Sequence, residues 1–133
     1  MSETCLVFFR PNAGDLNSAA KALAECGLTI TRQGDVLTVG RPGSPQFRIA
    51  LSAAPHVAEE AAEIGAGTPH ESAMRECGAR FEIGIDDLDA ALDEINTLME
   101  VQGALQDAAQ GFLFLPWNGG LSEPWHEQPA EPQ

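Results

Sequence analysis

The sequence predicts an α+β domain with a mostly antiparallel sheet of about six strands and two main helices packed on one face. Apolar runs lie near both ends of the domain, at residues 5–9 and 112–115. Between them, stretches of alternating apolar and polar residues indicate half-buried strands, and two longer segments have apolar residues at helical spacing. We assign residues 1–120 to a single domain and the Pro- and Glu-rich residues 121–133 to a flexible C-terminal tail.

Six strands are expected, each bounded by turn residues such as Gly, Pro and Asp. The first and the last are apolar at every position, which is typical of strands that are buried on both faces. Three of the strands between them, residues 28–33, 46–52 and 79–85, alternate, so each has one apolar and one polar face. The predicted strands are residues 5–9, 28–33, 36–39, 46–52, 79–85 and 112–115.

Each of the two main helices is expected to begin at an aspartate cap. Asp15 precedes the first helix, which ends before Gly27, and Asp86 or Asp87 precedes the second, which ends before Gly111. One apolar stripe is predicted along the second helix: Leu88, Ala91, Leu92, Ile95, Leu98, Met99, Leu105 and Ala109. Because Asp-Leu opens both helices after a strand, two ferredoxin-like βαβ halves are one arrangement of this pattern.

Two short helices are predicted between the fourth and fifth strands. The first covers residues 55–64, with Pro55 in its first turn. The second begins at Thr68, where Thr68 and Glu71 form a capping box, and ends near residue 77.

Acidic residues dominate the composition and are concentrated in the second half of the chain. There are 20 Asp and Glu against 7 Lys and Arg, for a formal net charge of −13. Residues 1–54 carry a net charge of +1, and residues 55–133 carry −14. This balance argues against nucleic-acid binding, which needs clustered cations. It favours either a solvated acidic coat or a surface that steers a basic partner.

Cysteine usage and hydropathy predict a cytoplasmic protein. Cys5, Cys26 and Cys77 are odd in number and widely spaced, which indicates neither a disulfide framework nor a zinc site. The acidic N-terminus does not resemble a signal peptide, and no apolar run approaches the roughly 18 residues of a membrane helix. We therefore expect no membrane partner. The Arg-, Ala- and Gly-rich composition is typical of a GC-rich bacterial genome.

The sequence contains no motif for nucleotide binding or nucleophilic catalysis, so we predict no cofactor and no catalytic residue. The best cluster is helical: His56, Glu60 and Glu63 share one face, and His70 follows at the next helix start. These four residues could bind a divalent metal or supply an acid–base pair. A solvated helix face explains the same spacing, so the prediction is no metal, with this cluster as the alternative.

The two apolar strands predict an interaction surface. If they pair in the middle of the sheet, some of their side chains must emerge on the face that the main helices leave open, and such a patch needs a cover. The cover could be a second copy, a different protein, the Trp117–Trp125 segment, or the two short helices. The predicted contact residues are Phe8, Phe112, Phe114, Trp117 and Trp125.

These observations favour a non-catalytic, acidic protein-binding module, for example an inhibitor or immunity-type protein that docks a basic partner. Two alternatives stay open. One is a small metal- or ligand-binding enzyme that uses His56, Glu60, Glu63 and His70. The other is a structural subunit of a homodimer, in which the apolar strands bind a second copy of the chain.

Overall fold

The computed structural model describes residues 3–117 and 119–123. Within them the chain forms seven strands and five helices. In order these are β1 (Glu3–Phe9), α1 (Leu16–Glu25), β2 (Thr29–Gln33), β3 (Val36–Gly40), β4 (Phe47–Ser52), α2 (Pro55–Gly65), α3 (Glu71–Arg75), β5 (Ala79–Ile85), α4 (Leu88–Asp93), α5 (Ile95–Ala109), β6 (Phe112–Leu115) and β7 (Gly120–Ser122).

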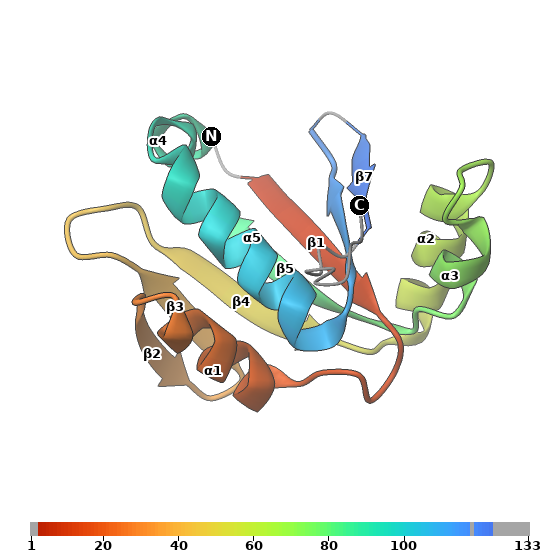
Figure 1. The fold of residues 1–133 in the computed structure, drawn as a ribbon, viewed down its shortest axis with the longest axis horizontal. Helices are drawn as coiled ribbons and strands as arrows, with labels where there is room; N and C mark the ends of the chain where they lie inside the picture. The colour runs from red at the N-terminus through yellow and green to blue at the C-terminus, as the bar shows by residue number, and fades with distance from the viewer. Residues whose placement is uncertain (1–2, 118, 124–133) are drawn as a thin grey trace, which may run out of the picture.

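A single sheet runs through the molecule in the order β2-β3-β4-β5-β1-β6-β7, and every neighbouring pair is antiparallel. Helices α1 and α5, the two main helices of the sequence prediction, lie side by side on one face of it (Figure 1). This confirms the predicted α+β class and the two helices on one face. No helix among the described residues combines the length and the hydropathy that a membrane crossing requires.

The main core lies between the sheet and the α1–α5 layer. Alternate residues of each central strand point to this face, as the period of two requires. Val7 of β1, Ile83 of β5 and Ile49 of β4 are all fully buried there, together with Leu23 of α1 and Leu105 of α5. The aspartate cap predicted at Asp15 is present and forms a capping box: the Asp15 carboxylate accepts from the Ser18 N–H at 2.8 Å, and the Ser18 hydroxyl accepts from the Asp15 N–H at 3.0 Å.

A second, smaller core lies on the opposite face of the sheet, under α2 and α3. Its buried members are Phe8, Val57, Ala61, Met74 and Cys77. Helices therefore cover both faces of the sheet near β1, and that part of the domain has three layers. Helices α2 and α3 thus provide part of the intramolecular cover that was one of the alternatives raised by the sequence: they bury Phe8 but leave Leu6, Phe112 and Phe114 half-buried. Helix α3 begins at Glu71 and not at the predicted Thr68, and no side chain caps it.

The predicted long second helix is two helices. Glu94, with φ −115° and ψ 47°, ends α4 and precedes α5. Because the break changes the helical phase, the apolar stripe does not stay on one buried face. Leu92, Ile95 and Met99 were expected in the core, and this prediction is wrong: they are 43%, 40% and 59% exposed.

The strand order does not confirm two ferredoxin-like halves. β5, α5 and β6 form a split βαβ unit, with β1 between two mutually parallel strands. In contrast, three strands separate β1 from β2. The sheet also extends past the domain boundary expected at residue 120, because β7 pairs with β6 and places Leu121 opposite Phe114.

Candidate functional site

One row of side chains crosses the second face of the sheet in direct cross-strand register. Its members, which we call the central row, are Val36, Ala50, Glu82, Leu6, Phe114 and Leu121, from β3, β4, β5, β1, β6 and β7. Adjacent strands lie about 4.8 Å apart, so these side chains are neighbours. All six are half-buried. The row forms a mainly apolar band that Glu82 interrupts.

Strands β1 and β6, which contain the two apolar runs, lie side by side, as the interaction-surface prediction required. Phe8, however, is fully buried under α2 and α3, so it is not available as a contact residue in this fold. Phe112 and Phe114 pack against the same cluster and remain half-buried. The apolar residues of the two strands that emerge on this face are therefore Leu6, Phe112 and Phe114.

The other predicted contact residues lie elsewhere. Trp117 is half-buried and packs against the main core, and Trp125 lies outside the described residues. Sequence reasoning missed Leu6, although it belongs to the same apolar run as Phe8. It also missed Leu121, because the Pro- and Glu-rich composition that follows placed this residue in the tail.

Arg80 lies at the border between the covered and the uncovered part of this face. Only 8% of the residue is exposed. Its guanidinium donates to Glu82 at 2.9 Å and to Glu60 of α2, and it lies 5.6 Å from the ring centroid of Phe8. His56 Nε2 is 3.4 Å from Nη2. The cation is thus held by two carboxylates and fastens α2 to β5.

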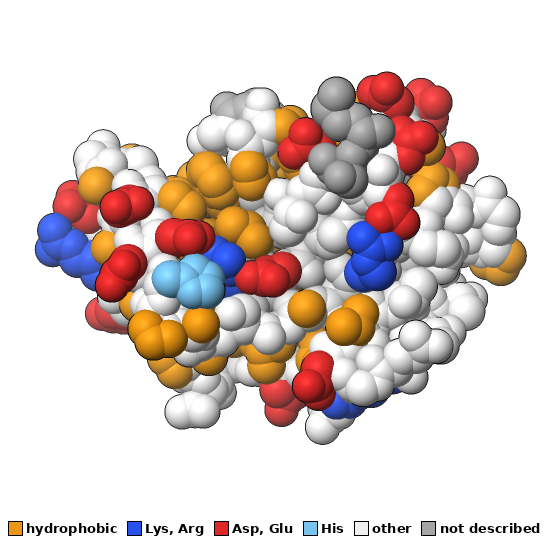
Figure 2. All heavy atoms as spheres, turned by 180° about the vertical axis from the view of Figure 1, so that it is seen from behind, with side chains coloured by type: hydrophobic (Ala, Val, Ile, Leu, Met, Phe, Trp, Pro, Cys, Tyr) orange, Lys and Arg blue, Asp and Glu red, His pale blue; other side chains and the backbone are white. Residues whose placement is uncertain are grey.

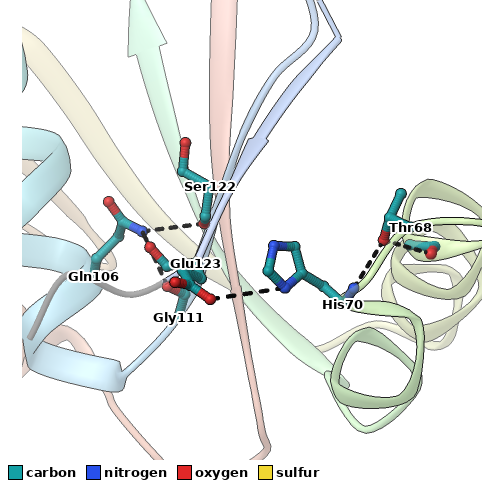
Figure 3. Close-up of polar contacts among 7 residues, drawn as sticks. Thr68, His70, Gln106, Gly111, Ser122 and Glu123 are labelled. Carbon is teal, nitrogen blue, oxygen red and sulfur yellow. Dashed lines mark hydrogen bonds and ion pairs between the residues drawn. The ribbon is translucent and has the colours of Figure 1, made fainter.

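The structure does not bring together the four residues of the alternative metal site. His56 and Glu60 meet at Arg80, while Glu63 is an exposed residue of α2. His70 precedes α3, with its ring centroid 5.3 Å from that of Phe112 and its Nδ1 4.0 Å from Glu123 (Figure 3). Across residues 3–117 and 119–123, no three His, Cys, Asp or Glu side chains are placed to hold a metal ion.

Carboxylates lie within and beside the central row. Glu60, Glu82 and Glu123 are at least partly exposed on this face. Arg48 of β4 is also on this face, and its charge is neutralised by Asp86, 2.6 Å away. Figure 2 shows hydrophobic side chains gathered on this face with acidic side chains around them. A shallow hollow of about 220 Å³ continues the row toward β3; its lining is Thr4, Val36, Arg48, Ala50, Glu82 and Gly84.

The cysteines do not form a nucleophilic site. Cys5 and Cys77 are buried, and burial raises the pKa of each thiol to about 11. Cys26 is only half-buried; burial and the nearby Glu100 carboxylate raise its pKa. A raised pKa means less thiolate at neutral pH, and the thiolate is the reactive form.

We therefore expect iodoacetamide at neutral pH to modify Cys26 well before Cys5 and Cys77. A two-unit rise in pKa lowers the thiolate fraction about 100-fold, and burial adds a barrier to access. Mass spectrometry of the folded protein, with a urea-unfolded sample as the control, measures the order. Rapid modification of Cys77 in the folded protein would contradict the burial described above.

Comparison of the chain with known protein families, with curated proteins and with solved structures finds no match. The fold and its second sheet face define an acidic α+β domain with a half-buried apolar row beside α2. The residues of that face are the basis for the functional proposal below.

Proposed function

We propose that the protein is a non-catalytic protein-binding module that docks a basic partner protein on the second face of its sheet. The observation that carries this proposal is the register of Leu6, Phe114 and Leu121. Three apolar side chains from adjacent strands line up on a face that α2 and α3 cover only in part. Aromatic side chains surrounded by polar groups are typical of the centres of protein interfaces.

The charges around the row support a basic partner. Four carboxylates, those of Glu60, Glu82, Asp86 and Glu123, stand against two guanidinium groups, those of Arg48 and Arg80. Both guanidinium groups are already paired within the molecule. A partner that contributes cations at the edge of the contact would gain in association rate and in specificity.

An inhibitor or immunity-type protein that neutralises a basic enzyme or toxin is a specific form of this function. The net charge of −14 on residues 55–133 supports it, because long-range attraction favours fast capture of a cationic target. The same charge disfavours self-association across this face, since two copies would bring carboxylates together.

The test compares Phe114→Ser and Leu121→Ser with Leu51→Ser. Leu51 lies on β4 outside the central row and, at 38% exposure, is a matched exposed apolar residue. Immobilised wild type is expected to enrich a basic protein from an extract of the producing organism. The two row variants should weaken binding of that protein at least tenfold, by isothermal calorimetry, and the control variant should not.

Salt supplies the second arm of this test. We expect the association rate to fall as the salt concentration rises, because exposed charges are screened within about 10 Å at 0.1 M salt. A partner that binds the row variants as tightly as wild type would refute the docking face. Dimerisation of the protein alone, seen by sedimentation and abolished by Phe114→Ser, would favour the homodimer instead.

A further inference from the structure

A second surface, on the opposite side of the sheet from the central row, carries exposed apolar groups. Among the described residues the large hydrophobic side chains classed as exposed are Leu51, Leu92, Ile95 and Met99. Three of these four lie on α4 and α5. Ile95 and Met99 are one turn apart, so they share a face of α5. The proposed docking face does not use any of the three.

Met99 also stands at one end of a groove of about 340 Å³ between α5 and the β6–β7 hairpin. The lining residues, which we call the α5 groove, are Met99, Gln102, Gly103, Gln106, Leu113 and Ser122. Gly103 leaves the groove open, because a Cβ at this position would meet no atom within 4 Å. Leu113 belongs to the main core, which places the groove on the α5 side of the sheet.

The wall of the groove is held in place by a buried amide. Gln106 Nε2 donates to the carbonyl oxygens of Gly111, Ser122 and Glu123, at 3.2, 3.3 and 3.1 Å (Figure 3). These bonds tie the end of β7 to α5. A groove whose two walls are fixed in this way loses little entropy when a ligand binds.

The elements that form the groove carry acidic residues and no Lys or Arg. No Lys or Arg follows Arg80 in the sequence, so α4, α5, β6 and β7 contain no cation. Asp93 and Glu94 are exposed beside Ile95, and Asp107 is exposed on the turn after Gly103. Glu100 is the residue of α5 that pairs with a cation, Arg41 from the loop before β4.

We propose that the α5 groove binds a basic amphipathic helix of a partner protein. Charge complementarity selects cations. Met99 and Leu113 in the groove, with Ile95 exposed one turn before Met99 on α5, select an apolar stripe on the same ligand. From Ile95 to Gln106 the helix extends about 17 Å, which matches three turns of a docked helix. Addition of a strand to β7 would gain little, because β7 has only three residues.

A second copy of the chain and an anionic membrane are poor occupants of the same groove. Both would bring negative charge against Asp93, Glu94 and Asp107. Because the groove and the central row lie on opposite faces of the sheet, the two surfaces do not compete. The module would therefore be able to bind two basic partners at once.

The test uses a fluorescein-labelled 14-residue Lys/Leu peptide with Leu at helical spacing. Its controls are a peptide of the same composition in scrambled order and a Glu/Leu peptide. Fluorescence anisotropy should show binding of the amphipathic Lys/Leu peptide only. Ile95→Gln and Met99→Gln, which remove apolar contact without adding charge, should each weaken binding about tenfold, and Asp93→Asn should weaken it several-fold.

Leu51→Gln is the matched control and should bind the peptide as wild type does. Phe114→Ser should also bind it normally, so failure of this proposal is distinguishable from failure of the docking face. Circular dichroism checks that each variant is folded. Equal affinity of Met99→Gln and wild type, or equal binding of the scrambled or Glu/Leu peptide, would overturn the proposal. Amide shifts on peptide binding that leave α5 unaffected would also overturn it.

Discussion

Phe8→Ala is expected to lower the free energy of unfolding by about 3–5 kcal/mol, the usual cost of truncating a fully buried Phe. Phe8 is 0% exposed and is the largest side chain of the second core. Its ring lies between β1 and the α2–α3 layer, and the Arg80 guanidinium is 5.6 Å from its centroid. Truncation would leave a cavity that rigid sheet backbone closes only in part.

Urea unfolding measures this change, with Phe114→Ala as the matched control. Phe114 lies on the neighbouring strand β6 and on the same face, but it is only half-buried. Its truncation should therefore cost clearly less than that of Phe8. Hydrogen exchange in α2 and α3 should accelerate in Phe8→Ala more than exchange in α1 does, because α1 packs on the other core. Equal costs for the two variants would show that α2 and α3 do not seal Phe8.

The sheet and its main core were largely predictable from the sequence. Alternation places Phe47 and Ile49 on one face of β4 and Arg48 on the other, and the structure has this arrangement. Strand β6 and the apolar part of β1, residues 5–9, pair in the sheet, and both of their faces are covered at least in part. Periodicity is a local property, and these elements depend on it.

Other features depend on contacts between distant residues, which periodicity does not encode. The apolar stripe from Leu88 to Ala109 did not reveal the break at Glu94. The spacing of apolar residues predicts helical structure, but it does not show where one helix ends and the next begins in a new orientation. Burial of Phe8 depends on Val57 and Met74, about 50 and 66 positions away in the chain.

The candidate site shows the same division. The sequence predicts that His56 and Glu60 lie one turn apart on the same helix, and the structure confirms this helix as α2. Their partner could not be identified from spacing, because Arg80 comes from β5, twenty positions beyond Glu60. An imidazole and a carboxylate that look like metal ligands in the sequence instead face a cation.

Arg80→Met is expected to lower the free energy of unfolding by about 2–4 kcal/mol. Removal of one partner of a buried ion pair leaves the remaining charges without compensation, which costs about 3–5 kcal/mol when both partners are fully buried. Here Arg80 is buried, but Glu60 and Glu82 remain partly exposed. Solvent screens the two carboxylates, so the expected cost is reduced.

Two comparisons isolate the electrostatic part of this effect. Adding Glu60→Gln and Glu82→Gln to Arg80→Met should restore more than half of the lost stability, because no unpaired carboxylate then remains. Arg75→Met removes the exposed pair with Glu71 on α3, and should cost less than about 0.5 kcal/mol. If Arg80→Met costs no more than Arg75→Met, the guanidinium does not fasten α2 to β5. If it costs as much as expected, the edge of the docking face is held by one cation shared between two carboxylates from different elements.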